Sequence, residues 1–92
     1  MTDPDARFEE LRRGIAENDR AIVAAVNARL RLVAELWRLK DERGTPRLDP
    51  EREARLRAGL REANEGPLST DGLDRLVDEL LELTKRELGG TG

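Results

Sequence analysis

The chain has 92 residues, of which 37% are hydrophobic and 40% are charged, and its net charge at pH 7 is −3. This acidic balance disfavours a nucleic-acid partner, because phosphate contacts draw their strength from clustered Lys and Arg. The chain has no cysteine and no histidine, which excludes disulfides and thiol chemistry and makes a metal centre or a histidine-based catalytic triad unexpected.

The residue pattern predicts one all-α domain over residues 1–92, with residues 1–6 and 89–92 as disordered tails. Aromatic residues make up only 2% of the chain, which argues against a sheet sandwich, and the high charge content is typical of long helices. No apolar stretch approaches the length of a membrane-spanning helix, and the N-terminus is acidic where a signal peptide is basic. We therefore expect a cytoplasmic protein with no membrane partner.

The first predicted helix runs from about Phe8 to Arg43. Its apolar residues recur at spacings of three, four and seven, which marks one helical face. They are Phe8, Leu11, Ile15, Ile22, Val26, Val33 and Leu36. Such a helix is about 54 Å long, whereas a compact domain of this size has a radius of gyration near 12 Å. The helix must overhang its own domain, which predicts a homodimer.

Two cations, Arg29 and Lys40, lie among the apolar residues of this helix. Because successive residues turn by about 100°, the two side chains point within about 20° of one another, about 16 Å apart along the axis. They could bind a small dianion between them. Arg12 lies about 25 Å from Arg29 and points about 100° away, so it cannot reach the same ligand unless a partner chain supplies it.

Two further helices follow after Gly44 and Pro46, which end the first. Helix two is expected from Pro50 to about Ala63, with Asp49 as its N-cap and Pro50 at its first position. Asn64-Glu65-Gly66-Pro67 breaks it. Helix three starts at Ser69 or Thr70, either of which can cap it, and runs to about Leu88.

The order of lengths, long, short and medium, resembles the all-helical AroQ class of chorismate mutases. The segments that carry the likeness are Leu11-Arg12-Arg13-Gly14-Ile15, Asn18-Asp19, Asn27-Ala28-Arg29, Lys40 and Asp49-Pro50-Glu51-Arg52-Glu53. The resemblance implies an intertwined homodimer with shared active sites and no cofactor. It also implies the rearrangement of chorismate to prephenate in aromatic amino-acid biosynthesis, a pericyclic shift that needs no proton transfer and no nucleophile.

By the same resemblance, fixed cations do the catalytic work. Arg29 and the partner chain's Arg12 correspond to the arginines that grip the two carboxylates, and Lys40 to the lysine at the ether oxygen. Arginine suits a carboxylate because it binds both oxygens at once. Glu53 corresponds to the glutamate that binds the ring hydroxyl. Asp49, expected to be a helix cap first, and Arg52 are implied to contact the substrate as well.

The third helix departs from the family pattern. Thr84 falls where the family has a small hydroxyl residue, but Leu88 falls where Gln or Glu commonly supports the lysine at the ether oxygen. Glu87 is one position away, which turns it by about 100°. Either the last turn is displaced and Glu87 serves, or another group does, or catalysis is weak.

Other functions stay open on the sequence alone. The same scaffold could serve as a 4-amino-4-deoxychorismate mutase or an isochorismate-pyruvate lyase. It could also be a non-catalytic helical module that binds a ligand or acts as an adaptor, although such a module gains nothing from two cations on an apolar face, where each costs desolvation. Family resemblance further allows activation by a partner enzyme of the same pathway.

Overall fold

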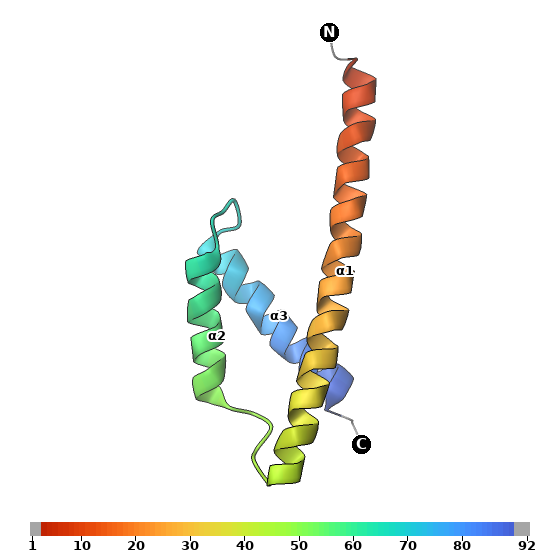
Figure 1. The fold of residues 1–92 in the computed structure, drawn as a ribbon. Coiled ribbons are helices and arrows are strands. Elements are labelled where there is room, and N and C mark those ends of the chain that lie inside the picture. The colour runs from red at the N-terminus through yellow and green to blue at the C-terminus, as the bar shows by residue number, and fades with distance from the viewer. Residues whose placement is uncertain (1–2, 90–92) are drawn as a thin grey trace. The chain divides into compact units, whose positions relative to one another are not determined.

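A computed structural model describes residues 3–89, and these residues form three helices and no strand (Figure 1). The helices are α1 (Pro4–Arg43), α2 (Pro50–Ala63) and α3 (Thr70–Leu88). The chain divides into two compact units, whose boundary falls inside α1, between Leu32 and Val33. Within residues 3–89, no helix is long and apolar enough to cross a bilayer.

Helix α1 begins at Pro4, four residues before the predicted start at Phe8. The carboxylate of Asp3 accepts a hydrogen bond from the Asp5 amide at 3.0 Å, and Pro4 occupies the first helical position. This pairing is a strong start signal, because proline lacks the amide hydrogen that a first-turn residue leaves unpaired. The prediction of a disordered tail was therefore wrong for residues 4–6. Met1 and Thr2 lie outside the described residues.

Helix α1 ends in a glycine cap that turns the chain back along its last turn. Gly44 has a φ of 69°, in the left-handed region that glycine adopts without a steric cost. The Thr45 amide donates to the Lys40 carbonyl at 2.8 Å, and the Gly44 amide donates to the Asp41 carbonyl at 3.2 Å. These two bonds form a Schellman motif. The connection to α2 thus leaves α1 in a fixed direction.

Helices α2 and α3 begin at the predicted caps. The Asp49 carboxylate accepts from the Arg52 amide at 3.2 Å, and the Ser69 hydroxyl accepts from the Gly72 amide at 3.0 Å. Each cap satisfies a first-turn amide that has no partner within the helix. At the other end of α3, Gly89 caps the last turn, and residues 90–92 of the expected tail lie outside the described part.

The second unit, residues 33–89, contains the buried side chains of the described chain. Trp37 from α1 and Leu73 and Val77 from α3 are the buried apolar residues, and Thr84 is the buried polar one. Val77 is fully buried. Burying such side chains is the main favourable contribution to folding. The apolar centre of this unit is small, and ion pairs between α2 and α3 add to it.

A group of ion pairs joins α2 to α3. Arg61 holds both carboxylate oxygens of Asp74 at 3.0 and 2.8 Å. Arg57 donates to the Asp74 carbonyl at 3.1 Å and to the Asp78 carboxylate at 2.6 Å. The pairing of Arg57 with Asp78 and of Arg61 with Asp74 shows that the helices run antiparallel. Hydrogen bonds from Arg61 lower the pKa of the Asp74 carboxyl.

Candidate active site

Lys40 lies on the last turn of α1, and its side chain is held by the connection that follows. Its ammonium nitrogen donates to the main-chain carbonyl of Arg47 at 3.1 Å, and the side chain is half-buried. The Schellman cap at Gly44 makes this contact possible, because it folds residues 45–47 back beside the helix they have just left. The lysine implied to meet the ether oxygen is therefore already oriented in the folded chain.

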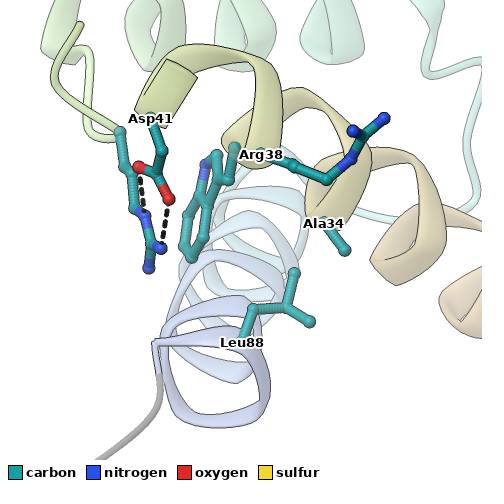
Figure 2. A pocket seen from close by; sticks show the side chains of 6 residues that line it. Ala34, Arg38, Asp41 and Leu88 are labelled. Atoms are coloured by element: carbon teal, nitrogen blue, oxygen red, sulfur yellow. Dashed lines mark hydrogen bonds and ion pairs between the residues drawn. The ribbon is translucent and has the colours of Figure 1, made fainter. Parts of the chain in front are cut away.

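The side chain of Arg47 anchors this connection to α1. Its guanidinium donates to both carboxylate oxygens of Asp41, at 3.0 and 2.6 Å, and lies 5.3 Å from the centre of the Trp37 ring. Hydrogen bonding to Arg47 lowers the pKa of the Asp41 carboxyl, and the same bonds raise the pKa of Arg47. Figure 2 shows the two interactions reaching the Asp41 carboxylate.

The first turn of α2 carries the next group of expected site residues. Asp49 caps the helix, as predicted, and its main-chain carbonyl accepts from the Glu53 amide at 3.0 Å. Asp49 and Glu53 are half-buried, and Arg52 is exposed. Because Asp49 follows Arg47 by two residues, the contacts of Arg47 with α1 also fix where this turn begins. Lys40, Asp49 and Glu53 thus belong to one locally ordered segment.

The last turns of α3 place their three expected residues differently. Thr84 is buried, and its hydroxyl donates to the Leu80 carbonyl one turn earlier at 2.7 Å. Leu88 is half-buried on the same face, one turn on, whereas Glu87 is exposed. In this structure Leu88, and not Glu87, faces the interior of the unit.

A cavity of about 290 Å³ opens beside the last turns of α1 (Figure 2). Its lining residues are Ala34, Trp37, Arg38, Asp41, Arg47 and Leu88. Of these, only Leu88 was among the expected site residues. Trp37 and Arg47 were not predicted, although one signal was available: Trp37 is the only tryptophan of the chain. No three acidic side chains within residues 3–89 are gathered where they could hold a metal ion.

The first unit, residues 3–32, carries the two remaining expected residues, Arg12 and Arg29. Arg12 is exposed, and its guanidinium lies 4.5 Å from the centre of the Phe8 ring. Arg29 is half-buried. The apolar face predicted for this helix is largely open to solvent: Phe8 is 55% exposed, Ile15 62% and Ile22 53%.

The comparisons with known proteins decide the family. Residues 11–87 match the family described as chorismate mutase type II. The chain belongs to this family. Among solved structures it is similar to the chorismate mutase of Thermus thermophilus in two forms. Form I has 33% identity and a TM-score of 0.81, with 85% of this chain and 98% of that chain covered. Form II has 32% identity and a TM-score of 0.82, with 87% and 91% covered. No curated protein matches the chain.

Membership of the chorismate mutase family confirms two predictions made from the sequence. The fold is all-α, with a long, a short and a medium helix among the described residues, and the protein is an enzyme of the isomerase class. The matched range includes every expected site residue except Leu88, which lies one position beyond it.

Proposed function

We propose that this chain converts chorismate into prephenate. The observation that carries the proposal is the family match over residues 11–87, together with the orientation of Lys40 by the Arg47 carbonyl. The reaction breaks one ether C–O bond while a C–C bond forms within the same molecule, so no proton acceptor or nucleophile is needed. A chain without histidine or cysteine can therefore catalyse it by positioning and charge alone.

Lys40 stabilises the ether oxygen in this proposal. Negative charge grows on that oxygen as the C–O bond lengthens, so an ammonium placed there binds the transition state more strongly than the substrate. The Arg47 carbonyl uses only one of the three ammonium hydrogens, which leaves two for the ligand. Lysine suits this task because its charge is concentrated at one point.

The remaining site residues bind and orient the substrate. Arg29 and the partner chain's Arg12 take the two carboxylates, which selects the compact conformer in which the reacting carbons meet. Glu53, which is half-buried, accepts the one hydrogen bond that the ring hydroxyl can donate, and the half-buried Asp49 contacts the same part of the substrate. The wall of the site is completed by Arg52, Thr84 and the last turn of α3, which contains Leu88.

We also propose that the working form is an intertwined homodimer in which the whole chain acts as one functional domain. The exposed apolar face of the first unit supports this, because an amphipathic helix is marginal in water unless its apolar face is packed. A second copy that pairs along this face would cover it and bring Arg12 to the opposite site. A cytoplasmic location and activation by a partner enzyme stay predictions.

The test is to incubate the purified protein with chorismate and follow the loss of chorismate and the appearance of prephenate. Parallel incubations with 4-amino-4-deoxychorismate and isochorismate separate the related activities, because acids at Asp49 and Glu53 can accept from an amine as well as from a hydroxyl. Prephenate formation that is lost in Lys40→Ala is the expected result. Binding of chorismate without any product would show a non-catalytic module and overturn the proposal.

A further inference from the structure

We propose that Arg47 is a positioning residue for Lys40, and this inference rests on the proposed function. Arg47 contacts α1 at both of its ends. Its main-chain carbonyl accepts from the Lys40 ammonium at 3.1 Å, while its guanidinium holds the Asp41 carboxylate through two bonds. The guanidinium also lies over the ring of Trp37. A single loop residue therefore joins a lysine, a carboxylate and an aromatic ring within one turn and a half of α1.

A carbonyl oxygen is well suited to orient a catalytic ammonium. Lysine has a flexible four-carbon stem, and fixing it costs side-chain entropy when the substrate arrives unless the folded protein has already fixed it. A carboxylate in the same place would also hold the stem, but its negative charge would partly neutralise the ammonium. The carbonyl is neutral, so Lys40 keeps its full charge for the developing oxyanion.

The side chain of Arg47 is what keeps that carbonyl in place. Residues 45–48 are all exposed, so little apolar packing holds them. The Schellman bonds fix the chain only as far as Thr45. Beyond that point, the paired bonds to Asp41 and the contact with Trp37 tie the segment to α1. Losing the guanidinium would leave the carbonyl covalently present but free to move away from Lys40.

Global stability and catalysis are expected to respond differently to this loss. An exposed ion pair contributes little to the free energy of unfolding, because water and salt screen it. The same pair has a local effect on Lys40 that the rest of the fold does not replace. A purely structural residue would instead lower stability and turnover together.

The variants are Arg47→Ala, Arg47→Lys and the reversed pair Asp41→Arg with Arg47→Asp. Arg38→Ala is the matched control, because Arg38 lines the same cavity on α1 but pairs only with Glu35 and Glu42 among the described residues. We expect Arg47→Ala to lower kcat about tenfold, with a smaller change in KM and little change in thermal midpoint. Arg47→Lys should recover part of the rate, because an ammonium cannot form the two parallel bonds. The reversed pair should recover more of the rate than Arg47→Lys, because it keeps an arginine and a carboxylate that can form the two parallel bonds.

A second readout does not depend on turnover. The chain has two lysines, Lys40 and Lys85, so labelling with ¹⁵N at Nζ gives two ammonium signals, which Lys85→Arg assigns. The Lys40 ammonium should be motionally restricted in the native chain and should become as mobile as the exposed Lys85 in Arg47→Ala.

Equal mobility of Lys40 in the native chain and in Arg47→Ala would overturn the inference. So would a kcat for Arg47→Ala no lower than that for Arg38→Ala. If the Lys40 ammonium is restricted in the native chain and mobile in Arg47→Ala, but the native chain does not convert chorismate, the proposed function fails and the ordering of Lys40 by Arg47 stands.

Discussion

The two units of the chain differ in how far their apolar side chains are buried. In residues 3–32 the apolar side chains line one helical face and are open to solvent, with Leu11 49% exposed and Ile22 53% exposed. In residues 33–89 three apolar side chains are buried, and paired arginines and aspartates join α2 to α3. The second unit is held by contacts within one chain, whereas no side chain of residues 3–32 is buried.

The two units should therefore respond to different substitutions. The face of residues 3–32 should control assembly, because an exposed apolar stripe gains its stabilisation only when another surface covers it. The segment from Lys40 to Glu53 should control chemistry, because it holds the oriented ammonium and the capped start of α2. The ion pairs between α2 and α3 should affect stability alone.

The largest expected effect is the loss of turnover in Lys40→Ala. In the proposed site the ammonium stabilises charge that develops only in the transition state, so its removal should lower kcat by roughly a hundred- to a thousandfold. Steady-state kinetics with chorismate measures this. Lys85→Ala, which removes the same group from the exposed face of α3, is the matched control and should keep the native rate. A native kcat in Lys40→Ala would show that Lys40 is not a catalytic residue.

The next effect is on assembly. Ile22→Glu places a carboxylate in the apolar face of the first unit, and symmetry places it there twice, so we expect association to weaken by about a hundredfold or more. Light scattering should shift from twice the 10.4 kDa chain mass towards the mass of one chain. Ala24→Glu adds the same charge on the opposite side of α1 and should leave the dimer intact. Dissociation by both variants alike would contradict an interface on this face.

The smallest effect is on the stability of the second unit. Asp74→Asn removes the charge held by Arg57 and Arg61, and we expect the thermal midpoint at pH 7 to fall by about 3–5 °C. In the folded chain the pKa of Asp74 lies below its ordinary value of 3.8, because Arg61 donates hydrogen bonds to the carboxylate. Its stabilisation is therefore complete above that value and is lost as the pH falls through the lower native pKa.

The difference in midpoint between the native chain and Asp74→Asn should accordingly shrink as the pH is lowered from 7 towards and below 3.8. Thermal unfolding followed by circular dichroism at several pH values measures it. Asp71→Asn, with the same change of charge on the exposed first turn of α3, is the control. A difference that stays constant across this range would show that Asp74 acts through packing and not through its charge.

The helices were largely predictable from the sequence, because their limits are set by local chemistry. Asp49 with Pro50 and Ser69 are caps whose effect depends on the next few residues only. The start of α1 was missed although Asp3 and Pro4 carry the same signal as Asp49 and Pro50. Apolar periodicity begins only at Phe8, so it places the start of the helix too late.

The contacts around Lys40 were not predictable in the same way. Arg47 reaches Asp41 and Trp37 only because a left-handed Gly44 reverses the chain, and no periodic pattern reports which side chains a reversal brings together. The pairing of Arg61 with Asp74 likewise depends on how α2 and α3 align. Lys40 was indicated both by its alignment with Arg29 on the apolar face and by the family resemblance, whereas the substrate contacts of Asp49 and Glu53 follow from the resemblance alone; these roles are proposals.

Activity in a mixed dimer tests most directly whether each active site is shared between two chains. Arg12→Ala and Lys40→Ala should each be nearly inactive alone, because each homodimer carries its defect at both sites. After subunit exchange, one site of each mixed dimer carries both defects and the other carries neither, so about a quarter of the native activity should return in an equal mixture. No recovery, with exchange verified by mass spectrometry, would contradict a site shared between two chains.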